Sequence, residues 1–275
     1  MRTLILAMDG LEYTLVKQWK LRYLMQTRHG THKPFISPRK KKPHSPSLWA
    51  SFITGKKLEE HGVDDWWKWH WLIDRIRYLP PLVWIKGKRR IIEKLTGYRI
   101  RPKNALKALK NRPKTLFDIV KPSIAIDVPT WNMDLDRRFW IEKSLKQSVA
   151  KYIEEVWRRH KEKVELLLNH INNDWKLLMI WLDAPDLLGH VCIAKCRLKL
   201  LSLYMNLNGL VKKINEEIGD NTFILVVSDH GMKAMPDGTG DHTDYGFWSI
   251  NRDWEWFNPK KITDFFNLIL KVVEI

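Results

Sequence analysis

The chain has 275 residues, a length that allows one large α/β core or a core with an inserted cap. Lysine and arginine outnumber aspartate and glutamate by 48 to 31, and the net charge of +17 favours anionic partners such as phosphorylated substrates, nucleic acid or acidic lipid. No apolar run is long enough to cross a bilayer, and Arg2 leads directly into a predicted strand, so we expect neither a transmembrane segment nor a signal peptide.

The chain begins with a predicted strand, a helix and a basic loop. Residues 2–8 form an apolar run short enough for a buried strand, which ends in Asp9 and Gly10. Residues 11–28 have a helical pattern. Residues 29–43 are rich in lysine, arginine and proline, and we interpret them as a solvated surface loop, called the basic loop below.

A possible loop-to-helix junction follows in the segment HSPSLWASFITG, residues 44–55. Ser45 precedes Pro46, which biases its backbone to extended conformations, and a helix can run from Ser47 to a stop at Gly55. A hydroxyl at such a junction lies close to free N–H groups and to the positive end of the helix dipole, the setting that a bound phosphate needs. A simple N-cap serine is the alternative interpretation.

Residues 56–122 differ in composition, because several of the chain's 15 tryptophans are interleaved there with lysine and arginine. Apolar residues at helical spacing, interrupted by Pro80 and Pro81, predict a helical cap inserted into a single domain that spans 1–275. The alternatives are an aromatic packing layer with a solvated basic face, and a helix that lies on a membrane surface.

The middle of the chain predicts further helices and strands. A short helix over residues 114–120 precedes a strand over 123–128, and residues 138–170 form one long amphipathic helix. The apolar runs 178–182 and 223–227 are two more buried strands.

Three of the predicted strands end in carboxylates and imidazoles. In open α/β sheets the carboxyl ends of the strands form the edge where ligands bind, and these side chains are ligands for first-row metals. An N-cap aspartate with a surface histidine would explain one such pair, but three occurrences are hard to attribute to capping. The residues are Asp9 after 2–8, Asp186 and His190 one helical turn apart after 178–182, and Asp229 and His230 after 223–227.

Both cysteines, Cys192 and Cys196, lie in a predicted helix over residues 190–218. Two thiols make no zinc site by themselves, and a disulfide across one helical turn is geometrically poor. We therefore expect small core residues in a reducing compartment and a cytoplasmic location.

The C-terminal part adds one more candidate ligand. A glycine-rich loop, residues 236–240, leads to His242, for which Asp241 and Asp244 are possible competitors. A strand over 246–250 and a helix over 260–273 complete the chain.

Six motifs, taken in order, make the chain resemble a known family. They are MDG at 8–10, SPSLWASFITG at 45–55, EEHGV at 59–63, APDLLGH at 184–190, SDHGM at 228–232 and GDH at 240–242. The set is similar to that of the alkaline phosphatase superfamily, and within it to the type I phosphodiesterase/nucleotide pyrophosphatase family. The resemblance implies an alkaline-phosphatase-like three-layer sandwich, with a central, mostly parallel sheet and helices on both faces.

The resemblance also implies the site residues. The family's nucleophile stands ten residues before the glycine of its TG motif, here Gly55, which implies Ser45. The family usually has proline two residues after the nucleophile, whereas Pro46 follows directly, so Ser47 is a rival. Two divalent metal ions, zinc by preference with manganese or iron as alternatives, would then be held by Asp186, His190 and His242 and by Asp9, Asp229, His230 and the Ser45 oxygen.

The implied activity is metal-dependent hydrolysis of phosphodiester or nucleotide pyrophosphate bonds through a phosphoserine intermediate. The expected partner is an anionic phosphate ester, most simply a nucleotide, and nucleic acid is not expected as a stable partner. A phosphomonoesterase or phosphomutase on the same fold is one alternative. A basic nucleic-acid-binding or membrane-binding protein with an inactive hydrolase core is another. A sulfatase is a poor match, because Trp49 stands where its motif requires arginine.

The charge of the substrate separates the phosphodiesterase activity from the phosphomonoesterase activity. Enzymes that prefer dianionic monoesters usually place a fixed cation beside the metals, and the predicted ligand segments contain no lysine or arginine except Lys233, just beyond the last of them. Residues 66–90 offer tryptophan faces for a base and basic side chains for further phosphates. We therefore expect a diester to be preferred over the matching monoester.

Overall fold

A six-stranded sheet forms the centre of the protein, seen in a computed structural model that describes residues 1–66, 79–80, 91, 94–95, 112–134, 141, 143–219 and 221–275. Its strand order is β2-β8-β5-β1-β4-β3. The central strand β1 (Arg2–Met8) pairs in parallel with β4 (Leu177–Leu182) and β5 (Thr222–Val227), and β3 (Ser123–Ile126) extends the parallel part beyond β4. The strands predicted at 2–8, 123–128, 178–182 and 223–227 are thereby confirmed.

The other edge of the sheet is antiparallel. β8 (Gly246–Ile250) runs against β5, and β2 (Arg28–His32) runs against β8. The basic loop therefore begins as an edge strand, and the prediction that all of it is loop is wrong. The sequence of β2, RHGTH, has no apolar pattern, so its pairing with β8 comes from the tertiary structure.

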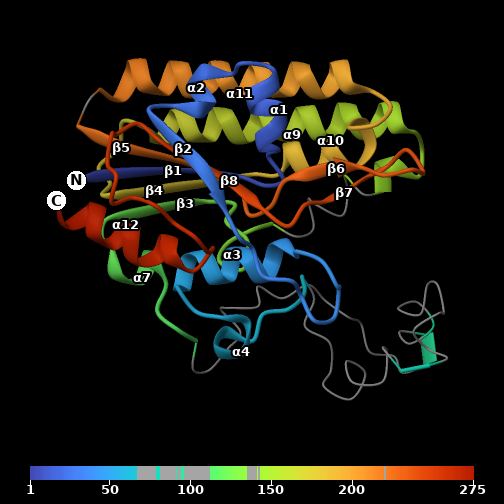
Figure 1. The fold of residues 1–275 in the computed structure, drawn as a ribbon, viewed down its shortest axis with the longest axis horizontal. Coiled ribbons are helices and arrows are strands. Elements are labelled where there is room, and N and C mark those ends of the chain that lie inside the picture. Colours follow the sequence, from blue (N-terminus) through green and yellow to red (C-terminus); the bar gives the residue numbers. More distant parts are fainter. Residues whose placement is uncertain are drawn as a thin grey trace.

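Helices cover both faces of the sheet, which confirms the three-layer α/β fold (Figure 1). Alternate residues of β1 separate the two cores, with Leu4 and Leu6 in one and Ile5 and Ala7 in the other. On the first face lie α1 (Tyr13–Gln18), α2 (Arg22–Met25), α9 (Val149–His170), α10 (Ala184–Cys192) and α11 (Arg197–Ile218). On the second lie α3 (Ser45–Thr54), α4 (Leu58–His61), α7 (Leu116–Ile119) and α12 (Asp264–Glu274).

Two predicted helices are shorter than expected. The segment 11–28 holds α1 and α2, separated by a turn in which Lys20 has a φ of 52°. In the segment 138–170, α9 begins only at Val149. The Ser148 side chain caps the start of this helix by accepting a hydrogen bond from the backbone N–H of Lys151.

The two cysteines form a disulfide, so the prediction of free thiols is wrong. The predicted helix 190–218 is interrupted: α10 ends at Cys192, and Cys196 is the residue before α11. The pair therefore spans a helix break, with 4.3 Å between the Cα atoms, rather than one turn of a continuous helix. The expected cytoplasmic location depended on reduced cysteines and loses that support.

Most of the predicted cap, residues 56–122, lies outside the described residues. Its described ends contain α4 and α7, which belong to the second helical layer. The cap itself stays a prediction. None of the helices in the described ranges is both long and apolar enough to cross a bilayer.

A small second sheet lies beyond the carboxyl ends of the central strands (Figure 1). It pairs β6 (Met232–Ala234) with β7 (Gly240–His242) in antiparallel orientation. Gly240 allows β7 to approach α10 closely, because a Cβ at this position would lie 2.4 Å from the carbonyl oxygen of Gly189.

Buried His32 makes the fold sensitive to acid. Its side chain is 3% exposed at the end of β2, and its Nε2 lies 2.7 Å from the carbonyl oxygen of Ser228. Burial lowers the pKa of His32 from its usual 6.5 to about 4. Because the folded-state pKa is the lower one, this contribution to stability is fully present above pH 6.5 and is lost as the pH falls toward 4, and it amounts to at most about 3 kcal/mol.

We therefore expect His32→Gln, which keeps an N–H donor but takes up no proton, to weaken the pH dependence of the unfolding free energy in that range. Urea denaturation at several pH values measures this dependence. His29→Gln removes an exposed histidine of the same strand, whose pKa burial also lowers, and as the control it should weaken the pH dependence less than His32→Gln does. Identical pH profiles for the parent and His32→Gln would contradict the prediction.

Candidate metal centre

The predicted site residues meet at the carboxyl ends of the three adjacent strands β5, β1 and β4. Asp9 follows β1, Asp229 and His230 follow β5, and α10 follows β4. Two other segments reach the same place. Ser45 is the first residue of α3, and His242 ends β7.

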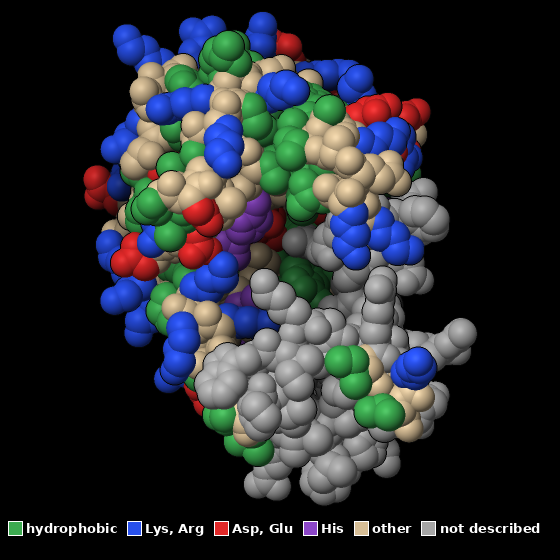
Figure 2. Space-filling model, turned by 90° about the vertical axis from the view of Figure 1, so that its right-hand side faces the viewer, with side chains coloured by type: hydrophobic (Ala, Val, Ile, Leu, Met, Phe, Trp, Pro, Cys, Tyr) green, Lys and Arg blue, Asp and Glu red, His purple; other side chains and the backbone are tan. Residues whose placement is uncertain are grey.

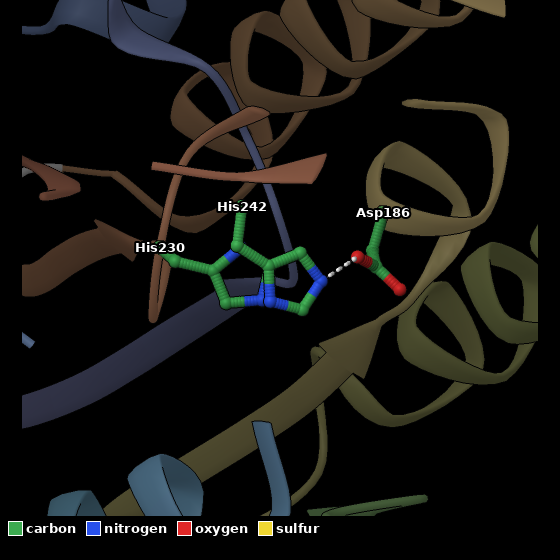
Figure 3. A group of neighbouring side chains, drawn as sticks. All are labelled: Asp186, His230 and His242. Carbon is green, nitrogen blue, oxygen red and sulfur yellow. Dashed lines mark ion pairs between the residues drawn. The ribbon is translucent and has the colours of Figure 1, made fainter. Parts of the chain in front are cut away.

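The first cluster consists of Asp186, His190 and His242. Oδ1 of Asp186 lies 3.2 Å from Nε2 of His190 and 3.4 Å from Nε2 of His242, and the two Nε2 atoms are 3.2 Å apart. Figure 3 shows Asp186 extending from α10 toward the His242 ring. Three potential ligand atoms thus converge on one point.

Backbone carbonyls orient both histidines of the first cluster. Nδ1 of His190 lies 2.8 Å from the Gly240 oxygen, and Nδ1 of His242 lies 2.8 Å from the Pro43 oxygen. A carbonyl only accepts hydrogen bonds, so each Nδ1 carries the hydrogen and each Nε2 is directed to the cluster. Metal-binding histidines in proteins are commonly held in this way.

The second cluster consists of Ser45, Asp9, Asp229 and His230. The Ser45 hydroxyl lies 3.2 Å from Oδ1 of Asp9 and 3.2 Å from Nε2 of His230. The same Nε2 is 3.5 Å from Oδ1 of Asp9 and 3.5 Å from Oδ2 of Asp229. The two clusters adjoin, because the His230 ring stacks on that of His242 at 3.7 Å between centroids (Figure 3).

The spacing of these atoms suits a metal ion. A tetrahedral zinc ion with ligands at about 2.0–2.1 Å separates its ligand atoms by about 3.3–3.4 Å. In groups such as Asp186, His230 and His242, or Asp9, Asp229 and His230, the ligand atoms lie within 4.8 Å of one another. His230 is within reach of both positions, so each cluster has the donors and the dimensions of a divalent metal site.

The electrostatics of the second cluster also favour a cation. Asp9 and Asp229 are fully buried, and burial together with the Asp9 charge raises the pKa of Asp229 well above its usual range. Within the described residues, Oδ2 of Asp229 has no hydrogen-bond donor. Burial lowers the pKa of His230 well below 6.5, so this imidazole is neutral and cannot supply the missing positive charge. A dication would.

In the first cluster, the histidines offset the charge of the carboxylate. Burial alone would raise the pKa of Asp186, but His190 and His242 outweigh it and hold that pKa well below its usual range. Asp186 in turn raises the pKa of His190 to about 9. The one carboxylate of this cluster is therefore charged.

Two tryptophans hold the carboxylate of Asp9, and the sequence did not predict this. The indole N–H of Trp49 donates to Oδ2 of Asp9 at 3.2 Å, and that of Trp181 donates to the same oxygen at 3.0 Å. Oδ1 of Asp9 therefore stays available to Ser45 and His230 of the second cluster. No motif around either tryptophan signals this contact, because both lie far from Asp9 in the sequence.

Glu12 is another residue that the sequence did not single out. Its carboxylate accepts hydrogen bonds from the Met232 backbone N–H at 2.9 Å and from the Tyr245 hydroxyl at 2.6 Å. It thereby ties the loop after β1 to the loop that carries Asp229 and His230. Glu12 is 2% exposed, and its hydrogen bond with the Met232 backbone is buried.

The rival nucleophile and the histidine of the EEHGV motif lie outside both clusters. The hydroxyl of Ser47 is buried and has no hydrogen-bond partner among the described residues. His61 contacts the Ser51 hydroxyl at 3.0 Å and accepts a hydrogen bond from the Val63 backbone N–H at 3.0 Å. His61 therefore orders the turn after α4.

Gly10 allows the loop after β1 to approach α10. Its φ is +66°, and a Cβ added there would lie 2.8 Å from the Cα of Asp186. We expect Gly10→Ala to displace Asp186 and to weaken metal binding at the first cluster roughly tenfold or more, as loss of a ligand's support commonly does. Metal competition with a chelator measures the affinity.

Gly62→Ala is a matched control for this prediction. Gly62 has a φ of +67°, but a Cβ there meets nothing within 4 Å. Both substitutions cost about 1 kcal/mol of backbone strain, and only Gly10→Ala adds the steric contact. If both variants bind metal like the parent protein, the close approach to α10 has no part in holding Asp186.

Comparison with known proteins identifies the family of the chain and proteins of similar fold. The sequence matches the family described as type I phosphodiesterase / nucleotide pyrophosphatase over residues 3–252. A search of curated proteins found no match. The alkaline phosphatase from the Antarctic bacterium TAB5 has a similar fold, with a TM-score of 0.53 and 12% identity over 99% of this chain and 98% of that one.

Murine ectonucleotide pyrophosphatase / phosphodiesterase 5 is a second similar structure. Its TM-score is 0.47 and its identity 12%, over 86% of this chain and 59% of that one, so the chain spans about three fifths of that protein's length. An inactive form of the murine protein in complex with AMP has a TM-score of 0.45 and 13% identity over the same shares.

The family match covers nearly the whole chain and includes all six motifs. The fold agrees with it independently, since the TAB5 enzyme is superposed over almost its entire length. The chain therefore belongs to the type I phosphodiesterase/nucleotide pyrophosphatase family.

Proposed function

We propose that the protein is a metal-dependent hydrolase of phosphodiester or nucleotide pyrophosphate bonds that acts through a phosphoserine intermediate. The observation that carries this proposal is the convergence of a serine hydroxyl with two adjoining clusters of carboxylates and imidazoles, contributed by five separate segments.

The two clusters would each hold one divalent ion, with zinc the best match to their mixed histidine and carboxylate donors. The first cluster supplies Asp186, His190 and His242, and the second supplies Asp9, Asp229, His230 and the Ser45 oxygen. Bound ions would neutralise phosphoryl charge and lower the pKa of the attacking hydroxyl.

Ser45 is the nucleophile in this proposal. Its hydroxyl donates to Asp9 and lies at the amino end of the ten-residue helix α3, where the helix dipole favours negative charge. Oγ forms a bond to phosphorus, and the leaving oxygen departs with the electrons of its own bond. Water then cleaves the phosphoserine and restores the hydroxyl.

The substrate is an anionic phosphate ester, and a nucleotide is the form that family membership supports. Preference for a diester over a monoester and the contribution of residues 66–90 stay predictions, because nearly all of that segment lies outside the described residues. A phosphomonoesterase or phosphomutase remains the alternative on the same fold.

A metal analysis combined with two matched substrates tests the proposal. We expect two zinc ions per chain, loss of turnover after chelation, and a higher kcat/KM for bis(4-nitrophenyl) phosphate than for 4-nitrophenyl phosphate. Higher kcat/KM for the monoester would support the phosphatase alternative. A protein that holds no transition metal, and whose activity chelators leave unchanged, would overturn the proposal.

A further inference from the structure

Lys42 places a cation beside the first cluster, although the segments that carry the predicted ligands contain almost none. The end of the basic loop lies against β7, and Nζ of Lys42 is 2.6 Å from Oδ1 of Asp241. The two residues are 199 positions apart in the sequence. Lys233, the lysine nearest to the ligand motifs, is exposed on β6.

Two neighbouring contacts hold Lys42 next to His242. Oδ1 of Asp241 accepts hydrogen bonds from the Lys42 ammonium and also from the backbone N–H of His242, at 2.9 Å. Pro43, which follows Lys42, accepts the Nδ1 hydrogen of His242 through its carbonyl. The ammonium therefore has a set position relative to the first cluster.

The ammonium keeps hydrogen-bonding capacity for a ligand. It has three N–H donors, and among the described residues Asp241 is its one acceptor. The side chain is 41% exposed, so a ligand can reach it. Figure 2 shows histidine side chains in a hollow of the surface with lysine and arginine side chains along its border.

Two other cations of the basic loop, Arg39 and Lys40, are engaged elsewhere, and Lys41 is exposed. Arg39 pairs with Asp64 at 2.6 Å, and Lys40 lies 3.7 Å from Asp65. Both pairs tie the loop to the chain after α4 rather than to β7. Lys42 is thus the member of this run whose ion pair lies beside the metal ligands.

The position of Lys42 relative to Ser45 determines which part of a substrate it meets. Ser45 belongs to the second cluster, whereas Lys42 lies beside the first. Attacking and leaving oxygens stand roughly in line on opposite sides of phosphorus. A substrate attacked by Ser45 therefore has its leaving group on the side of the first cluster.

We infer that Lys42 is a specificity-determining residue that binds a phosphate carried by the leaving group, so that the enzyme favours phosphoanhydrides such as nucleoside triphosphates over aryl diesters. The inference rests on the proposed function. Ser45 Oγ bonds to the phosphorus next to the nucleoside, the bond from that phosphorus to the bridging oxygen breaks, and pyrophosphate leaves with the electron pair. The hydroxyl proton passes to water, and the ammonium offsets the charge that develops on pyrophosphate.

Lys42→Met keeps most of the side-chain length and removes the charge. We expect its kcat/KM for ATP to fall roughly tenfold or more, the loss of one charge-assisted hydrogen bond, and its kcat/KM for bis(4-nitrophenyl) phosphate to fall much less. Lys41→Met removes the neighbouring exposed lysine and should leave both values at the parent level. Binding of pyrophosphate, measured by calorimetry, should weaken by a similar factor in Lys42→Met.

The outcomes distinguish the inference from the proposed function. Equal losses on both substrates, together with reduced metal content, would mean that Lys42 only supports Pro43 and His242, and would overturn the inference. Unchanged pyrophosphate binding in Lys42→Met would also overturn it. A parent protein that binds pyrophosphate through Lys42 but hydrolyses neither substrate would refute the proposed function, and would retain phosphate binding by Lys42 but not its part in substrate specificity.

Discussion

Ser45→Ala is expected to lower kcat for a phosphodiester by a factor on the order of 10³ or more, as loss of other covalent nucleophiles does. Ser45 is 5% exposed, its hydroxyl contacts both Asp9 and His230, and no other serine or threonine hydroxyl in the described residues has these two partners. Steady-state kinetics measure kcat. Rapid acid quenching with labelled substrate should trap a phosphoserine in the parent protein and none in the variant.

Ser47→Ala is the control for this experiment. Ser47 lies two residues after Ser45 in the same helix, and its hydroxyl is buried and has no hydrogen-bond partner among the described residues. Its removal should therefore leave kcat near the parent value. Full activity in Ser45→Ala beside an inactive Ser47→Ala would reverse the assignment.

Asp229→Asn is expected to remove most activity and one of two bound metals, because a neutral amide binds a dication far more weakly than a carboxylate. It should at the same time stabilise the metal-free protein. Asp9 and Asp229 are both fully buried around His230, and burial with the Asp9 charge raises the pKa of Asp229. Asparagine relieves this repulsion and can still accept the hydrogen bond of the Gly10 backbone N–H through its oxygen.

Elemental analysis and urea denaturation, with and without a chelator, measure both effects. The expected result is lower metal content with a gain of about 1 kcal/mol in the unfolding free energy of the metal-free form. Asp244→Asn, at an exposed position two residues after His242, is the control and should change neither quantity. Full metal content in Asp229→Asn would exclude this carboxylate as a ligand.

The centre of the sheet and most of the candidate site were predictable because they depend on local sequence. A continuous apolar run such as 178–182 or 223–227 is buried on both faces only as an inner strand, and the polar residues that follow it must lie at the strand's carboxyl end. Parallel strands bring those ends together. Asp9, Asp186 and Asp229 could therefore be grouped without knowing any contact between them.

Edge elements and helix limits were less predictable. β2 has a polar sequence, and only its partner β8 gives it strand geometry. The segment between α10 and α11 contains no proline or glycine, so the helical periodicity of the sequence continues through the break and hid the disulfide geometry of Cys192 and Cys196.

By itself, the sequence determined the central strands, the six motifs and the set of carboxylates and imidazoles at one edge of the sheet. The tertiary structure alone decided which neighbours orient these side chains and which charges lie beside them. The indoles of Trp49 and Trp181 donate to Asp9, the Pro43 carbonyl accepts from His242, and the Lys42 ammonium pairs with Asp241. Local patterns reflect interactions between residues a few positions apart. These contacts join residues tens to hundreds of positions apart, and their geometry is set by how helices and loops pack on the sheet.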